Sequence, residues 1–448
     1  MTSAELRASL SLASLYGLRM FGLFVILPVF AIYSEQLRGG GDLLLVGAAI
    51  GAYGLVQGLL QIPFGLLSDR WGRKPLIYTG LVLFAAGSFI AAAATDIWIV
   101  ILGRAVQGAG AISAAVIAML ADLTRDEVRT KAMALIGSSI GATFALSLIL
   151  SPWLNHLIGV PGIFALTGVL VVAAIPVVAF VVPPEPARIA RRAPPRFREV
   201  LLSAELLRLN WGVFALHAIL MALFIAVPLS LRDAGLPLEA HWKVYLPVML
   251  ASFACMLPAV FLSERKQATK RVFVGAIALL AGALAAMPWV LSQAGPTVAF
   301  LVVFFTAFNV LEALLPSLAT RFAPVAGKGA AIGIYSTVQF LGTFVGAAVG
   351  GYLFQRHGAW GLTVFLVLLA ASWLAVAGAM RVPARAETRS YPLAPDLASE
   401  YPTLSLALER LPGVQEVLIS ETERVAHLKV DAARFDEQNA LKLIGGQA

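Results

Sequence analysis

The chain has 448 residues, of which 59% are hydrophobic and only 13% are charged, and its mean hydropathy is +0.86. No soluble globular protein needs so much apolar surface, so the composition excludes a soluble enzyme and indicates a polytopic membrane protein. The formal net charge of +8 is spread over the segments between apolar runs. Such a distribution fits loops that lie on lipid headgroups better than a nucleic-acid partner.

Twelve apolar stretches reach the length of about 20 residues that a membrane-spanning helix needs. They are residues 10–33, 44–67, 76–94, 97–120, 132–155, 160–182, 210–231, 242–262, 272–292, 296–318, 329–354 and 359–380. The loops on one side of these spans carry eighteen Lys and Arg residues, and the loops on the other side carry four. The positive-inside rule therefore predicts a multi-pass protein of the cell inner membrane with both termini in the cytoplasm.

The spans divide into two groups of six, on either side of a connection rich in proline and arginine. We expect an N-terminal six-helix bundle at 1–182, a cytoplasmic linker at 183–209, a C-terminal six-helix bundle at 210–383 and a small soluble tail at 384–448. The sequence Ser-Glu-Arg at 263–265, after the eighth span, echoes Ser-Asp-Arg at 68–70, after the second. A weak repeat of this kind is typical of two bundles related by duplication.

Three glycine-rich motifs lie at defined places among the spans. Residues 65–75, between spans two and three, read Gly-Leu-Leu-Ser-Asp-Arg-Trp-Gly-Arg-Lys-Pro, residues 103–110 read Gly-Arg-Ala-Val-Gln-Gly-Ala-Gly, and residues 137–141 read Gly-Ser-Ser-Ile-Gly. They resemble the signature loop of the major facilitator superfamily, its Arg-x-x-Gln-Gly-x-Gly motif and the glycine signature of its antiporter branch, where Ala142 replaces the usual proline. The resemblance covers residues 1–380 and implies an all-α membrane fold of twelve transmembrane helices in two six-helix bundles.

The tail resembles a heavy-metal-associated domain, which has a small α+β ferredoxin-like fold, from Leu-Glu-Arg-Leu-Pro-Gly-Val at 408–414 onward. Alternating apolar residues predict strands near 416–420 and 425–430, followed by a helix from Phe435. The metal-binding Cys-x-x-Cys of that family is absent, so we expect no metal in the tail. A docking or regulatory role, with a ligand or partner of its own, is the alternative to a tail without function.

The signature loop supplies a candidate conformational latch, whose residues are Gly65, Asp69, Gly72, Arg73 and Asp122. A transporter that alternates between two open states needs a contact that holds one of them. The resemblance implies a charge network of Asp69, Arg73 and Asp122, with Asp69 facing the positive N-terminal end of span eleven near 329–332. The alternative is that these charges only set the membrane topology and are otherwise solvated.

Charged side chains inside the spans are costly in hydrocarbon, so each should face a cavity or a partner. Arg19, Arg104, His217 and Glu312 lie in spans one, four, seven and ten, which the resemblance implies line the central cavity. Together with Asn309, one turn from Glu312, they are candidates for the substrate or proton pathway, and Glu312 is the best candidate proton carrier. The alternative is that they satisfy one another structurally, as in a buried Arg–Glu pair.

The motifs together predict a secondary active transporter that exports small apolar or amphipathic molecules in exchange for protons by alternating access. The glycine motif of span five, Gly137 and Gly141, favours antiport, and these two with Gly342 and Gly346 are expected to permit close approach of helices. The two alternatives are a solute/proton symporter or facilitator of the same fold, and a membrane sensor that signals through its tail.

Other classes of function find no support in the sequence. The chain has no Walker loop, so we do not expect it to hydrolyse ATP. The single Cys255 allows no intramolecular disulfide and no cysteine metal cluster. We therefore expect no cofactor and no metal, and the expected partners are a small-molecule substrate, protons and membrane lipids.

Overall fold

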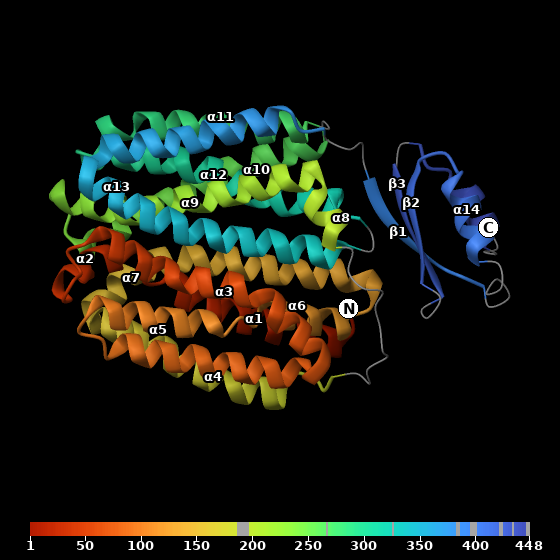
Figure 1. Cartoon of the computed structure of the whole chain (residues 1–448), viewed down its shortest axis with the longest axis horizontal. Coiled ribbons are helices and arrows are strands. Elements are labelled where there is room, and N and C mark those ends of the chain that lie inside the picture. The colour runs from red at the N-terminus through yellow and green to blue at the C-terminus, as the bar shows by residue number, and fades with distance from the viewer. Residues whose placement is uncertain are drawn as a thin grey trace.

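The computed structural model describes residues 1–185, 197–265, 268–324, 327–381, 386–394, 401–420, 424–431 and 434–444. Residues 186–196 of the expected linker therefore lie outside the described residues. Long helices run side by side along one axis, and both chain termini lie toward the same end of this helical body (Figure 1). A small layer of strands and helices, formed by the tail, lies beyond that end.

The first half of the helical body starts with well-formed helix caps. Thr2 and Glu5 form a capping box in which each side chain accepts a hydrogen bond from the backbone N–H of the other. Asp42 and Asp96 cap two later helices with their carboxylates. The elements of this half are α1 (Ser3–Phe24), α2 (Leu27–Tyr33), η1 (Ser34–Gln36), α3 (Leu43–Trp71), α4 (Arg73–Ala92), α5 (Ile97–Ala109), α6 (Ser113–Asp122), α7 (Asp126–Pro176) and η2 (Val177–Val181).

The second half begins with a short helix that ends at Leu202, because Ser203 leaves the helical conformation and caps the next helix through its hydroxyl. The elements are α8 (Phe197–Leu202), α9 (Ala204–Asp233), η3 (Leu238–Ala240), α10 (Trp242–Arg265), α11 (Thr269–Val290), α12 (Ala294–Phe322) and α13 (Lys328–Gly378).

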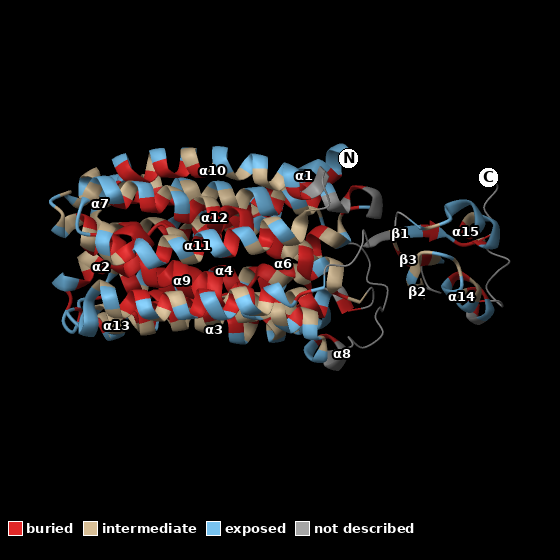
Figure 2. Cartoon of the chain, turned by 90° about the horizontal axis from the view of Figure 1, so that it is seen from above, coloured by how far each residue is buried: buried red, intermediate tan, exposed pale blue. Residues whose placement is uncertain are grey.

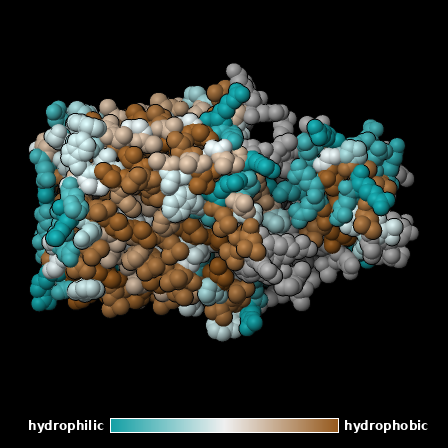
Figure 3. Space-filling model, turned by 45° about the horizontal axis from the view of Figure 1, so that its top comes forward, coloured by the Kyte–Doolittle hydropathy of each residue, from teal (hydrophilic) through white to brown (hydrophobic). Residues whose placement is uncertain are grey.

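The described residues contain ten helical segments that are long and apolar enough to cross a membrane. The longest two, α7 and α13, turn within their length at Gly159 and Gly358, whose φ angles of 65° and 62° suit glycine. Each of the two therefore holds two spans, and the predicted twelve-span fold is confirmed. Hydrophobic side chains cover most of the helical body, and hydrophilic ones gather at its ends and on the tail (Figure 3).

Glycines bring the two halves into backbone contact along α3 and α13. A Cβ atom added to Gly51 would lie 2.6 Å from Cα of Phe344, and one added to Gly47 would overlap the backbone at Ala347. Larger residues at these positions would force the helices apart, so the close approach depends on the missing side chains. Buried residues accordingly concentrate along the middle of the helical body, between its outer helices (Figure 2).

The close approach predicted for four glycines is found at two of them. Added Cβ atoms on Gly342 and Gly346 would collide with the backbone of α9, which confirms the prediction there. At Gly137 and Gly141 the prediction is wrong, because nothing in the described part of the chain lies within 4 Å of either Cβ position. The reason is rotational: α7 meets Gly17 of α1 through Ser139 and Thr143, which project on a different side of the helix.

The tail forms a sheet with helices on one side. Its elements are β1 (Ala386–Pro392), α14 (Tyr401–Glu409), β2 (Val414–Ser420), β3 (Val425–Asp431) and α15 (Glu437–Ile444), and the antiparallel strands lie in the order β1-β3-β2. Ala426, Leu428 and Val430 of β3 are fully buried against the helices, and the residues between them are only partly buried. The ferredoxin-like fold predicted for the tail is supported by this arrangement, which includes a first strand, β1, that was not predicted.

Candidate functional site

The loop between α3 and α4 is organised by the Arg73 side chain. Its Nε donates to Oδ2 of Asp122 at 3.2 Å, and its Nη1 lies 2.5 Å from Oδ1 of Asp69 and donates to Oγ of Ser68 at 2.6 Å. The Arg73 side chain is only 12% exposed, so three elements, α3, α4 and α6, are tied at one largely buried cation. The structure thus brings together the three charged residues of the predicted network.

Backbone geometry allows this meeting. Gly72 adopts φ 112°, a conformation that L side chains rarely adopt, and so lets α3 and α4 follow one another with only this residue between them. Glu185, which was not among the predicted site residues, accepts a hydrogen bond from the backbone N–H of Lys74 at 2.5 Å. Its carboxylate therefore satisfies one of the free N–H groups at the start of α4. Gly65 lies on α3 beside Ala114 of α6, at an ordinary contact distance.

The expectation that Asp69 faces the start of α13 stays a prediction. Arg73 is the partner that the structure gives Asp69, whose side chain is 46% exposed. At the start of α13, no atom of the described residues lies within 4 Å of the Cβ position of Gly329. Gly329 itself is exposed, whereas Ala330 and Ala331 of the same turn are buried.

Arg19 lies in a buried polar cluster inside the first half. Its guanidinium donates to Oγ of Ser113 at 2.7 Å and to Oε1 of Gln57, and it lies over the ring of Tyr53, 5.5 Å from the centroid. The side chain is 1% exposed. Neutral dipoles and an aromatic face, rather than a carboxylate, thus surround this cation.

Arg104 also lies over the ring of Tyr53, 5.0 Å from the ring centroid, and is fully buried. It donates to Oε1 of Gln107 at 2.9 Å, and Gln107 in turn donates to Oγ of Ser88 at 2.7 Å. The motif of span four therefore connects α5 to α4 through polar side chains. In the described part of the chain, the predicted alternative of a buried Arg–Glu pair is not formed by Arg19 or Arg104.

His217 and Glu312 form a second polar cluster, in the other half. Nε2 of His217 lies 3.6 Å from Oε2 of Glu312, and Nδ1 lies 3.0 Å from the carbonyl of Val213. Because a carbonyl can only accept, Nδ1 carries the proton, and in the neutral ring Nε2 accepts from Nε2 of Gln339 at 2.7 Å. Helices α9, α12 and α13 thus meet at one titratable ring.

The surroundings of Glu312 make it accessible yet poorly satisfied. Its side chain is 37% exposed, although Oε2 itself is buried and has no hydrogen-bond partner among the described residues. Asn309, one turn earlier on α12, donates to Oγ of Ser252 on α10 at 3.2 Å instead of pairing with Glu312. The buried hydroxyl of Tyr335 also lacks a partner in the described part of the chain.

Aromatic rings join the two halves between these clusters. Phe144 of α7 packs edge-on against Phe24 of α1 at 5.1 Å between centroids, and against Phe224, Phe305 and Phe308 of the second half at 6.1–6.2 Å. It is buried, at 7% exposure. The centre of the molecule is therefore closed by rings from both halves.

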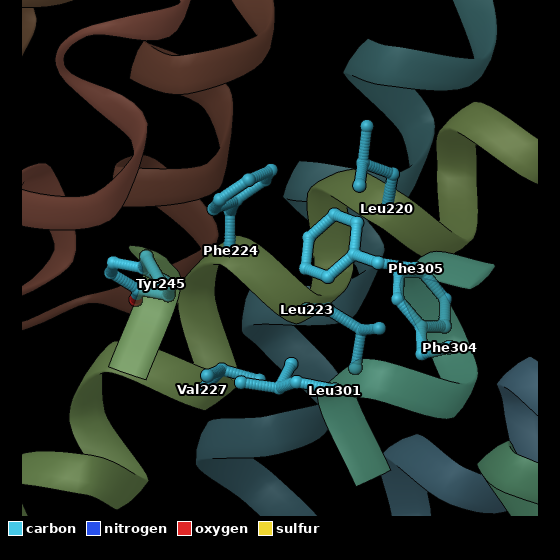
Figure 4. A pocket seen from close by; sticks show the side chains of 8 residues that line it. All are labelled: Leu220, Leu223, Phe224, Val227, Tyr245, Leu301, Phe304 and Phe305. Carbon is cyan, nitrogen blue, oxygen red and sulfur yellow. The ribbon is translucent and has the colours of Figure 1, made fainter. Parts of the chain in front are cut away.

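A small apolar cavity adjoins these rings. Leucine, valine and phenylalanine side chains of α9 and α12 line it together with Tyr245 of α10 (Figure 4). Its volume of about 10 Å³ is the least that admits one water molecule. The cavity therefore holds no more than about one water molecule in this structure.

The residues predicted for the cavity divide between the two halves. The structure gathers Arg19 and Arg104 around Tyr53, and it gathers His217 and Glu312 with Gln339. Tyr53 and Gln339 were missed, although Gln339 is a polar residue within an apolar span and that signal could have identified it. Tyr53 offered no such signal, because an aromatic residue in a span is ordinarily packing.

Three comparisons relate the chain to known proteins. A family model of the Major Facilitator Superfamily matches residues 12–347. The chain is 42% identical to the inner membrane transport protein YajR of Escherichia coli (strain K12), over 99% of this chain and 98% of that protein. It is 25% identical to the quinolone resistance protein NorA of Staphylococcus aureus (strain MRSA252), over 75% of this chain and 87% of NorA.

Solved structures show the same fold. A bacterial homologue of the human lysosomal transporter Spinster, in an inward-facing and occupied conformation, matches with a TM-score of 0.70 at 14% identity, over 84% of this chain and 96% of that one. The human organic anion transporter MFSD10 matches with a TM-score of 0.63 at 18% identity, over 84% of this chain and 100% of that one.

Proposed function

Because the chain belongs to the major facilitator superfamily, we propose that it exports small apolar or amphipathic molecules across the inner membrane in exchange for protons. Its family and its 42% identical relative make it a transporter rather than an enzyme. The proton part of the proposal rests on one observation, the contact between His217 and Glu312.

This contact has the chemistry of a proton site. Neutral His217 offers its Nε2 lone pair to Gln339, and protonation turns Nε2 into a donor that must find an acceptor. Oε2 of Glu312 lies 3.6 Å away without a hydrogen-bond partner in the described residues. A proton taken up by either group is therefore shared by both, and its arrival changes what α13 contacts through Gln339.

The latch residues supply the switch between states. We assign to Asp69, Arg73 and Asp122 the role of holding the loop side of the first half rigid, so that Asp69 can meet the start of α13 when that end closes. The exposed position of Gly329 at the start of α13, together with the rings that Phe144 joins, supports a state in which the halves are held together at these rings and Gly329 is accessible.

Substrate class and direction of transport are supported by three further observations. The central surface is apolar and aromatic, which suits apolar and amphipathic molecules. NorA, a 25% identical protein, carries the name of a quinolone resistance protein, which favours export. The excess of Lys and Arg in one set of loops favours placing the latch side and both termini in the cytoplasm.

Inverted membrane vesicles test the proposal, with a fluorescent quinolone and ethidium as probes. We expect acidification of the vesicle interior to drive uptake of at least one probe, and Glu312→Gln to abolish this dependence on the proton gradient. Glu239→Gln serves as the matched control, because the Glu239 side chain is exposed and lies near the end of the helical body opposite the latch residues. Uptake that ignores the gradient would favour a facilitator, and probe movement along with the protons would favour a symporter.

Deletion of the tail distinguishes a transporter from a sensor. Deletion of residues 384–448 should leave gradient-driven transport in place if the membrane body is the transporter. Loss of a downstream signal with no transport by the full chain would instead favour the sensor.

A further inference from the structure

The tail presents one covered and one open face of its sheet. Helices α14 and α15 pack on the face that carries Ala426, Leu428 and Val430. Strand register places Leu418 opposite His427, and Glu416 opposite Lys429, on the other face. Figure 1 shows the strands between the helical body and α14, so the open face is the one turned toward the body.

Lys429 connects this open face to the helical body. Its Nζ donates to the backbone carbonyl of Ala323 at 3.0 Å. Ala323 is the C-cap residue of α12, where the last carbonyls have no partner inside the helix and carry partial negative charge. A lysine ammonium at that place satisfies a free carbonyl and stabilises the helix dipole. Lys429 is partly buried, and this burial lowers the pKa of its amine.

The chain holds the tail close to this site. Arg381, just after α13, donates its backbone N–H to Oε1 of Glu205 at the start of α9 at 3.3 Å. Only residues 382–385 separate Arg381 from β1, so the sheet starts within roughly 17 Å of that anchor. A short tether of this kind raises the effective concentration of the tail at the end of the second half.

The end of α12 is also a packed surface rather than a loose loop. Val200 of α8 is 1% exposed and lies in a small cluster with Ala323, Ala330, Ala331 and Ile334. Charge favours the same site: the tail from residue 384 onward has ten acidic and seven basic residues, whereas the loops on the tail's side carry most of the Lys and Arg. A net negative tail is repelled by anionic lipid, which argues against the membrane surface as its partner.

We propose that the open face of the tail sheet is a docking surface for the end of α12, with Lys429 as the residue that caps this helix. The tail then moves with the second half as one body during transport. This inference stands apart from the proposed transport activity, because it concerns only where the tail binds.

Cysteine cross-linking in native membranes tests the docking, in full-length protein with Cys255→Ser. Leu418→Cys on the open face and Pro324→Cys beside Ala323 form the test pair, with a short bis-maleimide as the probe. We expect a cross-link in this pair and none when Pro324→Cys is combined with Glu409→Cys, at the exposed end of α14. A second control combines Leu418→Cys with Trp71→Cys, an exposed residue at the same end of the first half.

Substitution of Lys429 in the protein that carries the test pair of cysteines measures how much the Lys429 cap contributes to docking. We expect Lys429→Gln to lower the cross-linking rate about two- to fivefold, the range that a charge at a helix terminus supports, and Lys429→Arg to retain it. Cross-links to Trp71→Cys as fast as those to Pro324→Cys would show a freely tethered tail and overturn the proposal. Equal rates for the Gln and Arg variants would overturn the role of Lys429. Neither readout depends on transport.

Discussion

Arg73 Nε lies 3.2 Å from Oδ2 of Asp122 and thereby joins the start of α4 to the end of α6. The same guanidinium pairs with Asp69, which lies four residues earlier in the chain, on α3. Both carboxylates are more than a third exposed, whereas the Arg73 side chain is 12% exposed. The arginine is thus the shared and least replaceable member of the network.

Arg73→Gln should therefore disturb the loop more than loss of either acid alone. It leaves two carboxylates without their common cation, at a cost of about 1 kcal/mol after allowance for their exposure. We expect transport to fall about fivefold, Arg73→Lys to retain part of it, and Arg7→Gln, on an exposed position of α1, to have no effect. Normal transport by Arg73→Gln would remove the network from the mechanism.

Asp69→Asn addresses the latch itself. If Asp69 stabilises the start of α13 in the closed state of this end, its loss should shift the population toward the state in which this end is open. In a Cys255→Ser background, a cysteine at Gly329 should then react faster with a membrane-impermeant maleimide. An unchanged reaction rate would count against Asp69 as the latch.

The sequence predicted the spans well because they depend on local information, since span length and apolar content set the helices. Arg73 lies only four residues after Asp69 in the chain, and the turn at Gly72 between them lets the two side chains meet. The contact with Asp122 agrees with the placement of both residues at the same membrane face.

Rotation of helices and long-range pairing were harder to predict. Arg19, Arg104, His217 and Glu312 lie on the expected spans, but whether they meet depends on which side of each helix faces a neighbour. The strand β1, with the sequence Ala-Glu-Thr-Arg-Ser-Tyr-Pro, has no apolar alternation and forms because β3 pairs with it. The helix contacts predicted at Gly137 and Gly141 are wrong for the same reason, because the rotation of α7 turns other residues toward α1.

Glycine substitutions measure the contact between the halves. Gly51→Ala places a methyl group 2.6 Å from Cα of Phe344, and such overpacking costs about 1–3 kcal/mol. We expect a lower melting temperature of the detergent-purified protein. Gly137→Ala meets open space and gains helix propensity, so it should melt at the same temperature or higher. Equal destabilisation by the two variants would contradict the role assigned to the α3–α13 contact.

Phe144→Ala should weaken the central closure. The side chain contacts four rings from two halves, and each aromatic pair contributes about 0.5–1.5 kcal/mol beyond its buried area. The variant should open the centre, so that a cysteine at Phe305, in a Cys255→Ser background, becomes accessible from the α2 end. Phe144→Leu keeps part of the apolar volume and should open less. Unchanged protection in both variants would show that the rings do not close the path.

Acid stability of the tail depends on Glu437. The hydroxyl of Tyr391 donates to its Oε1 at 2.7 Å and Arg389 lies 2.6 Å from its Oε2. The hydrogen bond from Tyr391, followed by that from Arg389, holds the pKa of Glu437 below its usual value of 4.5. A carboxyl group whose pKa is lowered by folding stabilises the folded state at pH values above its pKa in the unfolded chain. This contribution is lost as the pH falls through the pKa of the folded state.

Hydrogen exchange of β3 in the full-length protein measures this effect. Glu437→Gln should exchange faster than the original protein at pH 6, and the difference in opening free energy should shrink below about pH 4.5, where the original protein loses the same interaction. Glu409→Gln, at an exposed carboxyl of α14, should match the original protein throughout. A difference that stays constant from pH 6 to pH 3 would mean that Glu437 stabilises the tail by packing rather than by charge.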